Sequence, residues 1–181
     1  MMSIDLKQSY FELFGLPVQY VLDDNALAAA FRKLQTEHHP DRFASGTDEA
    51  KRIAQQVTSF INTAQETLQS PRLRARYLLS LNGVDFDDER DTTSDMSFLM
   101  SQMERREALE QVAQASDPLD AIDELSRDVK KENFELQQSF AEAFEAGQFD
   151  EAKQIVLKLK FFERLMGEIK QQEERLEDDA I

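Results

Sequence analysis

Apolar residues recur every three or four positions along most of this 181-residue chain. In one stretch the spacings are 4, 3, 1, 3 and 4, which place the apolar side chains on one face of a helix. That stretch contains Ile53, Val57, Phe60, Ile61, Ala64 and Leu68. The alternating, β-branched runs typical of strands are scarce, and only five glycines and four prolines interrupt the pattern. These features predict an all-α fold.

Capping and helix-breaking residues divide the first half of the chain into four predicted helices. A short helix in residues 10–17 is closed by Gly15 and Pro17. A second helix begins at Asp23 or Asp24, either of which can cap it. It stops before Pro40, because the residue ahead of a proline is pushed out of the α region. A third helix ends at a Ser-Pro pair, and Pro71 is well placed to open a fourth, which runs to about residue 81.

The second half predicts a linker followed by three longer helices. Residues 83–95 are rich in acidic and hydroxyl side chains. Their aspartate spacing resembles a calcium loop only loosely, since Arg90 stands where such a loop needs glycine, so a solvated linker is favoured. From Met96 onward, breaks near Pro118 and Gly147 separate three helices, and the last has the 3- and 4-residue spacing of a bundle seam. We therefore expect a C-terminal three-helix bundle.

The charge is unevenly divided between the two halves. Residues 1–80 hold nine basic and nine acidic residues, whereas residues 81–181 hold twelve basic and twenty-seven acidic ones. This asymmetry accounts for the whole net charge of −15. Nucleic-acid binding depends largely on Lys and Arg contacts to phosphate, so no nucleic-acid partner is expected.

The compartment is predicted from segments and residue types that are missing. No apolar run approaches the ~20 residues that span a bilayer, and the first residues lack the layout of a signal peptide. The chain has no cysteine, which excludes disulfides, zinc–thiolate sites and thiol nucleophiles. We expect a cytoplasmic protein that contacts no membrane.

Both histidines lie in one short stretch, TEHHPDRF at residues 36–43. A metal site normally needs three or more ligands from different elements, and adjacent side chains at a helix end point in different directions. A Ser-His-Asp hydrolase is no better supported, because nothing marks a nucleophile elbow. His38 can instead be a helix-terminal residue that interacts with the helix dipole. We therefore expect no metal, no cofactor and no catalytic residue.

A third interpretation of the same stretch rests on the rigidity of its His-Pro-Asp tripeptide, HPD. Pro40 fixes its own φ and restrains His39, so Asp41 is held in a defined orientation at a turn between helices. Such a carboxylate loses little entropy on binding and can form a charge-assisted bond to an arginine of a partner. Positive charge beside it comes from Arg32, Lys33 and Arg42.

Residues 10–80 resemble a J domain, the module that binds a heat-shock ATPase of the DnaK type and stimulates its ATP hydrolysis. The resemblance rests on HPD between two patterned helices and on FINTAQETLQSP at residues 60–71, which is similar to the end of the family's third helix. It implies that HPD, residues 39–41, carries the stimulation and that Arg32 and Lys33 help docking. The glycine/phenylalanine-rich segment and zinc-binding repeats of general J-domain chaperones are missing, which indicates a specialised member.

The helix that begins at Met96 has more apolar surface than one buried face needs. At about 100° per residue, its inward face is formed by Phe98, Leu109 and Val112. A second stripe shares its side of the helix with glutamates and consists of Leu99, Met100 and Met103. Methionine suits adaptable contact surfaces, and acid beside apolar surface favours a partner with basic and apolar features.

The last helix repeats this arrangement. Leu157, Phe161 and Leu165 lie roughly opposite the seam residues of the same helix. Leu157 and Leu165 could pack inside the protein, since apolar stripes usually belong to a core, or they could contact a partner. The sequence leaves both alternatives open.

Three segments resemble the HscB family, the J-type co-chaperones of iron–sulfur cluster assembly. They are RARYLLSLNG at residues 74–83, FLMSQMERREALE at 98–110 and LKFFERL at 159–165. The resemblance covers nearly the whole chain and implies that a C-terminal domain binds the scaffold protein IscU and delivers it to the chaperone HscA. The lack of cysteine favours the bacterial members, since some eukaryotic ones add a cysteine-rich metal-binding segment.

The resemblance also implies which residues bind the scaffold. They are Leu99, Met100, Met103, Glu104, Glu107 and Phe161. Met103 stands where a leucine is common, a near-neutral exchange in volume, and Ser101 replaces a frequent acidic residue.

The expected organisation is a J domain at 1–82, an acidic linker at 83–95 and a three-helix scaffold-binding domain at 96–181. The expected function is that of a co-chaperone, not an enzyme. It would stimulate the ATPase activity of HscA and support cluster transfer from IscU. A J-domain co-chaperone for a different client is the alternative.

Overall fold

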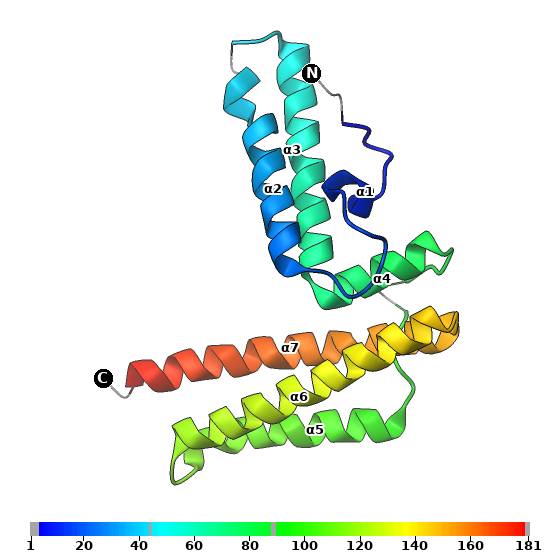
Figure 1. Cartoon of the computed structure of the whole chain (residues 1–181). Helices are drawn as coiled ribbons and strands as arrows, with labels where there is room; N and C mark the ends of the chain where they lie inside the picture. Colours follow the sequence, from blue (N-terminus) through cyan, green and yellow to red (C-terminus); the bar gives the residue numbers. More distant parts are fainter. Residues whose placement is uncertain (1–3, 44, 88–89, 180–181) are drawn as a thin grey trace. The chain divides into compact units, whose positions relative to one another are not determined.

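The computed structural model describes residues 4–43, 45–87 and 90–179. In this part of the chain the regular secondary structure is entirely helical, so the all-α prediction is confirmed (Figure 1). The chain divides into two compact units, Met1–Leu81 and Asn82–Ile181. None of the helices within the described ranges is both long and apolar enough to cross a bilayer.

The first unit is built around a helical hairpin. Its helices are α1 (Tyr10–Phe14), α2 (Asp24–His38), α3 (Asp48–Gln69) and α4 (Pro71–Leu81), with the short 3-10 helix η1 (Pro40–Phe43) after α2. α2 and α3 pack side by side as the two arms of the hairpin, and α1 lies against α3 (Figure 1).

Local capping explains where these helices begin and end. The Asp23 carboxylate accepts the backbone N–H groups of Asn25 and Ala26 at 2.9 and 3.1 Å, which fixes the start of α2. The Thr47 hydroxyl caps α3 in the same way. Gly15 ends α1 at a φ of 64°, a left-handed conformation that glycine adopts without strain.

The buried face of α3 differs from the predicted one at three positions, one of which is Phe60, which is only partly buried. Ala54 is buried, whereas Ile53, which was expected on this face, is 50% exposed. The buried positions then continue at spacings of 3 and 4 through Val57, Ile61, Ala64 and Leu68. Ile53 precedes Ala54 by one residue and therefore points about 100° away from that face.

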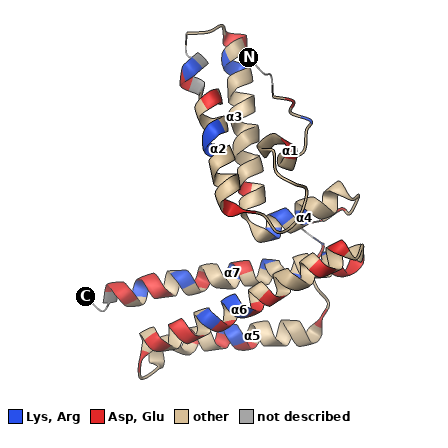
Figure 2. Cartoon of the chain, viewed as in Figure 1, with Lys and Arg blue, Asp and Glu red and all other residues tan. Residues whose placement is uncertain are grey.

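The second unit is a three-helix bundle. Its helices are α5 (Met96–Gln111), extended by the 3-10 turn η2 (Val112–Gln114), α6 (Pro118–Glu145) and α7 (Phe149–Asp179). Pro118 opens α6 at its first turn, and Gly147 provides the turn to α7 at a φ of 71°. Acidic residues are spread along α6 and α7 (Figure 2).

The core of the bundle shows which apolar residues of α5 and α7 are buried. Its buried cluster contains Val112, Ile122, Val129, Phe162, Leu165 and Ile169. Phe98 and Leu109 pack against this cluster, which confirms the predicted inward face of α5. Leu165 is 2% exposed and belongs to this core, whereas Leu157 is 7% exposed and also lines a groove between α5 and α7. Burial of such a side chain contributes about 1.5–3 kcal/mol to stability.

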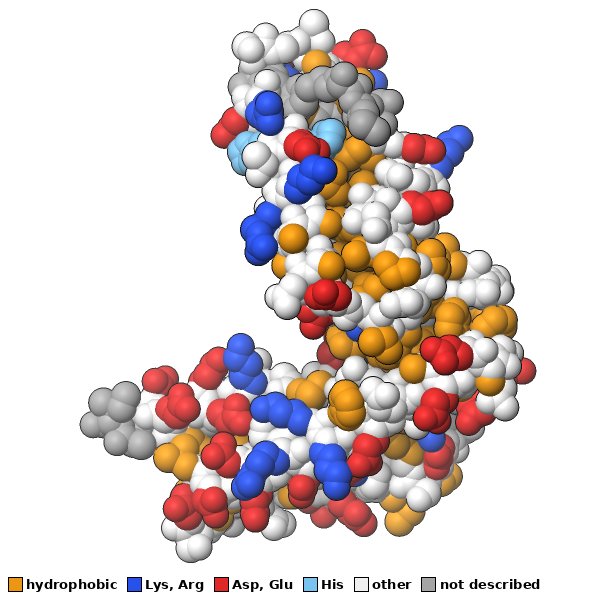
Figure 3. Space-filling view, viewed as in Figure 1, with side chains coloured by type: hydrophobic (Ala, Val, Ile, Leu, Met, Phe, Trp, Pro, Cys, Tyr) orange, Lys and Arg blue, Asp and Glu red, His pale blue; other side chains and the backbone are white. Residues whose placement is uncertain are grey.

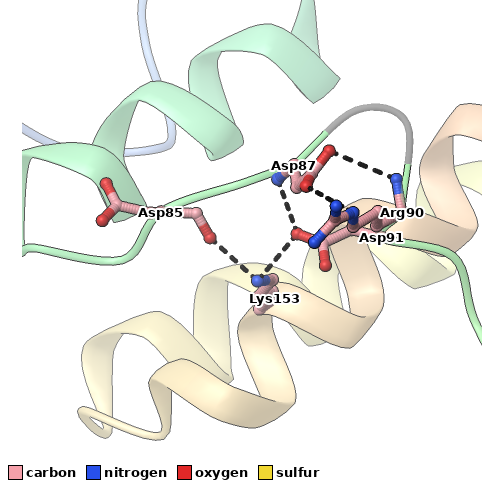
Figure 4. Close-up of polar contacts among 5 residues, drawn as sticks. All are labelled: Asp85, Asp87, Arg90, Asp91 and Lys153. Carbon is pink, nitrogen blue, oxygen red and sulfur yellow. Dashed lines mark hydrogen bonds and ion pairs between the residues drawn. The ribbon is translucent and has the colours of Figure 1, made fainter.

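The described part of the segment before α5 is irregular and mostly exposed, as expected of a linker, but it also contacts α7. The Lys153 ammonium of α7 donates to the backbone oxygen of Asp85 at 2.8 Å and lies 2.9 Å from a carboxylate oxygen of Asp91 (Figure 4). It also lies 5.1 Å from the centre of the Phe86 ring. Thr93 is only 3% exposed. The described part of the segment is therefore held against α7.

Candidate functional site

The HPD tripeptide forms a hydrogen-bonded turn after α2. The backbone carbonyl of His38 accepts a hydrogen bond from the Thr58 hydroxyl at 3.3 Å, which ties the end of α2 to α3. The backbone N–H of Arg42 donates to the carbonyl of His39 at 3.0 Å and closes η1. Pro40 opens η1, and the position of its side chain lies outside what the structure describes.

Asp41 presents its carboxylate to solvent, with the side chain 90% exposed. The backbone N–H of Asp41 donates to Nδ1 of His39 at 3.3 Å, and that nitrogen also lies 3.5 Å from the Asp41 carboxylate. The Nδ1 atom of His39 thus contacts both the backbone and the carboxylate of Asp41 and helps to orient the turn. The Asp41 carboxylate remains open to solvent.

The predicted basic residues lie at this turn and on the helix that precedes it. Arg32 and Lys33 are exposed on α2, and the Arg42 guanidinium donates to the carbonyl of Thr36 at 3.0 Å. Lys and Arg side chains and the histidines gather along α2 and the turn (Figure 3). The structure thus brings Arg42, His39 and Asp41 together at the turn, while Arg32 and Lys33 lie on α2, which precedes it.

A small hollow of about 270 Å³ opens beside the HPD turn. Besides His39 and Asp41, it is lined by Gln35, Thr58 and Asn62 from α2 and α3. The sequence analysis did not select these three residues as site residues, although Asn62 lies in the FINTAQETLQSP segment. Only the packing of the hairpin brings them to the turn.

The second unit carries a larger groove, of about 530 Å³, between α5 and α7. Its apolar wall is formed by Leu99, Met103, Leu157 and Phe161. The Met103 side chain is 63% exposed. The Phe161 ring meets Phe98 edge-on, with 5.6 Å between ring centres, which fixes its orientation at the wall.

The six predicted scaffold-binding residues fall into two groups. Leu99, Met103 and Phe161 line the groove. Met100, Glu104 and Glu107 are exposed but are not among its lining residues. Glu104 lies instead at a separate hollow between α5 and α6. The groove therefore takes up three of the six residues. Met100, Glu104 and Glu107 lie at helical spacing on the exposed side of α5.

Basic side chains edge this groove, which the sequence analysis did not anticipate. Arg106 of α5 and Lys160 and Arg164 of α7 are among its lining residues. Arg106 and Arg164 both pair with Glu168, at 3.4 and 3.2 Å. The acidic total of this half masked them, although Lys160 and Arg164 lie four residues apart beside the recognised Phe161.

One aspartate fixes the start of α5 next to α7. The Asp95 carboxylate accepts the backbone N–H of Phe98 at 3.0 Å and the ammonium of Lys158 at 2.7 Å. The Lys158 hydrogen bond, followed by the backbone N–H of Phe98, lowers the pKa of Asp95 below its usual 3.8. The cap and the ion pair together hold the two helices that form the groove.

Within the described ranges, no three His, Cys, Asp or Glu side chains come together as a potential metal site. Two exposed features of the described residues contain predicted site residues. They are the carboxylate of Asp41 on the first unit and the apolar groove with basic edges on the second.

Comparison with known proteins finds relatives that match nearly the full length of this chain. A family model described as the HSCB C-terminal oligomerisation domain matches residues 94–170. The chain is 44% identical to the co-chaperone protein HscB homologue of Burkholderia multivorans, covering 96% of this chain and 99% of that protein. It is 41% identical to the homologue of Cupriavidus taiwanensis, covering 98% of this chain and all of that protein.

Solved structures of the same family are also similar. Chaperone HscB from Vibrio cholerae superposes with a TM-score of 0.85 at 37% identity, covering 96% of this chain and 100% of that chain. Human co-chaperone protein HscB does so with a TM-score of 0.83 at 29% identity, covering 95% and 85%. The first unit is thus a J domain and the second a C-terminal helical domain, and the chain belongs to the HscB family of co-chaperones.

Proposed function

We propose that this co-chaperone acts in iron–sulfur cluster assembly, where it joins a scaffold protein of the IscU type to a DnaK-type ATPase of the HscA type. The observation that carries the proposal is the presence of two separate exposed surfaces on one chain of this family. The HPD turn displays Asp41 on the first unit, and the second unit opens an apolar groove beside Phe161. One chain can therefore bind the ATPase and the scaffold protein at the same time.

The HPD turn is the part that would stimulate ATP hydrolysis by the partner. A rigid, exposed carboxylate pairs with a partner arginine at little entropic cost, and Arg32, Lys33 and Arg42 supply positive charge for acidic surface on the ATPase. The chain itself contributes no chemical step. Its effect is to favour the conformation of the ATPase that hydrolyses ATP.

The first test is the steady-state ATPase rate of HscA with and without IscU. Asp41→Ala should abolish the stimulation and leave scaffold binding intact, because the side chain is exposed and supports no buried contact. Glu37→Ala, which removes another exposed carboxylate near the end of α2, is the matched control and should stimulate normally. Stimulation that survives in the Asp41→Ala protein would show that HPD is not the docking element.

The second test addresses the scaffold. Replacement of Leu99, Met103 and Phe161 by alanine should weaken IscU binding by roughly 2 kcal/mol or more, because central apolar anchors usually dominate an interface. Phe134→Ala removes a 60% exposed ring from α6, away from the groove, and should leave the affinity measured by calorimetry unchanged. A wild-type chain that stimulates HscA but binds no IscU would serve a different client.

A further inference from the structure

The basic edge of the groove gives information about its occupant that the apolar wall does not. An acid-edged patch would suit a basic partner, but the residues that line this groove include Arg106, Lys160 and Arg164. We propose that the scaffold segment entering the groove places an acidic side chain beside its apolar anchor, where Lys160 and Arg164 bind it. This inference rests on the proposed function and specifies the chemistry of the same site.

The local charge supports an acidic occupant. Arg106 and Arg164 share a single carboxylate, that of Glu168, so these two cations are only half neutralised. No ion pair of Lys160 is found in the described part of the chain. Asp91 also reaches the groove, but its carboxylate is already paired with Lys153 at 2.9 Å. The edge therefore carries a positive excess.

This excess stands out because the chain as a whole repels acidic partners. Its net charge is −15, so a scaffold segment with a carboxylate meets an unfavourable field over most of the surface. A cluster of cations at one groove reverses that field locally and favours a single orientation of the segment. Charge complementarity of this kind sets register and association rate more than total affinity.

A buried amide in the same groove offers a hydrogen-bond donor to a polypeptide occupant. Gln102 lines the groove and is 6% exposed, and its side-chain nitrogen has no hydrogen-bond acceptor among the described residues. A buried donor without an acceptor costs free energy until one is supplied. The last torsion of a glutamine side chain is soft, so a small rotation can offer the N–H group to a peptide carbonyl of the scaffold.

The test is a charge reversal with a matched control on the same helix. Lys160→Glu with Arg164→Glu changes the groove edge, and Lys170→Glu with Arg175→Glu changes exposed positions of α7 outside the groove. Both double variants have the same net charge, so long-range repulsion is equal in the two proteins. The measurement is the affinity of each full-length chain for the apo form of an IscU-type scaffold at low and high salt, with circular dichroism as the check of folding.

The groove variant should lose roughly tenfold or more in affinity at low salt, whereas the control should stay close to wild type. The salt dependence of binding should also become flatter in the groove variant, because fewer charge pairs form. Equal affinities of the two double variants, with the wild type binding normally, would overturn the acidic-segment inference and leave the proposed function intact. A wild-type chain that fails to bind the scaffold would overturn both.

A scan of the scaffold identifies the opposing carboxylate. Exposed Asp and Glu residues of the scaffold are changed singly to Lys, and one such change should restore affinity for the groove variant and lower it for the wild type. A different result is expected if the groove joins two copies of this chain. Charge reversal would then alter self-association in analytical ultracentrifugation and leave scaffold affinity unchanged, which would refute the inference.

Discussion

At the scale of single residues, we expect Gln102 to lower the stability of the free chain. Its amide nitrogen is buried with no acceptor among the described residues, and such a group costs about 1–3 kcal/mol. Gln102→Leu keeps a similar volume and removes the unpaired donor, so it should raise the free energy of unfolding by about 1 kcal/mol. Urea denaturation of the full chain measures this change.

The control for this prediction is Gln138→Leu, the same exchange at an exposed position of α6. It should alter stability by a few tenths of a kcal/mol at most, as surface substitutions usually do. If Gln102→Leu is stabilising and also weakens scaffold binding, the amide serves the complex rather than the fold. A destabilised Gln102→Leu protein would contradict the assignment.

Asp95 should make the stability of the folded chain depend on pH. Its pKa in the folded chain is lowered, first by the hydrogen bond from Lys158, so the ionised carboxylate favours the folded state. This stability is complete above the unfolded pKa near 3.8 and is lost as the pH falls through the lower folded value. Asp95→Asn keeps a capping side chain without the charge, so its thermal midpoint should lie below that of the wild type at pH 7.

The difference between the two midpoints should shrink as the pH drops below about 4, where the wild-type carboxylate takes up a proton. Lys158→Met removes the main cause of the pKa shift. In chains that carry Lys158→Met, the thermal midpoints with Asp95 and with Asn at position 95 should therefore differ less. A gap between wild type and Asp95→Asn that persists down to pH 2.5 would contradict the proposed electrostatic origin.

At the scale of helices and loops, the residues that could be predicted are those governed by local rules. Asp23, Thr47, Pro71 and Gly147 mark helix ends because each acts on the backbone within a few residues of itself. Ile53 was misplaced because the apolar spacing near the start of α3 allows two adjacent positions to face the core. Only the packing of the hairpin selects Ala54.

The contacts that could not be predicted are those that join distant parts of the sequence. Lys153 reaches Asp85 across 68 residues, and nothing near either residue indicates that they meet. The same applies to the basic edge of the groove, which α5 and α7 form together. Phe161 was identified through resemblance to a family, whereas its neighbours Lys160 and Arg164 were not. Charge totals summed over a whole domain hide such local clusters.

The anchoring of the segment before α5 can be tested by hydrogen exchange. The N–H of Asp87 donates to the Asp91 carboxylate at 2.8 Å, and Lys153 holds that carboxylate from α7 (Figure 4). Lys153→Met removes the ammonium and keeps the length of the side chain. The Asp87 amide should then exchange several-fold faster, because local opening no longer breaks an ion pair.

Lys130→Met at an exposed position of α6 is the control and should leave exchange of the Asp87 amide unchanged. Amides in the middle of α7 should keep their protection in both variants, since the bundle core does not involve Lys153. Unaltered exchange at Asp87 in the Lys153→Met protein would mean that the segment is held by other contacts, such as the buried Thr93.

At the scale of the whole molecule, each compact unit carries one of the two exposed surfaces. The first unit is formally neutral and the second carries the negative charge, so their partners can differ in chemistry. If the two surfaces act on different proteins, a change in one should leave the other contact intact. The covalent link between the two units would then bring the two partners together.

That link predicts the outcome of mixing two damaged chains. One chain carries Asp41→Ala and binds the scaffold, and the other carries alanine at Leu99, Met103 and Phe161 and keeps its HPD turn. On an intact chain, binding of the second partner is intramolecular, with an effective concentration in the millimolar range for a short connection. Two separate chains at micromolar concentration lack this advantage. The scaffold-dependent increase in HscA ATPase rate should therefore stay low in the mixture, even at equal total concentration. Full recovery to the wild-type increase would show that the two activities need no common chain, or that paired chains share their sites, and would reject the adaptor mechanism in its single-chain form.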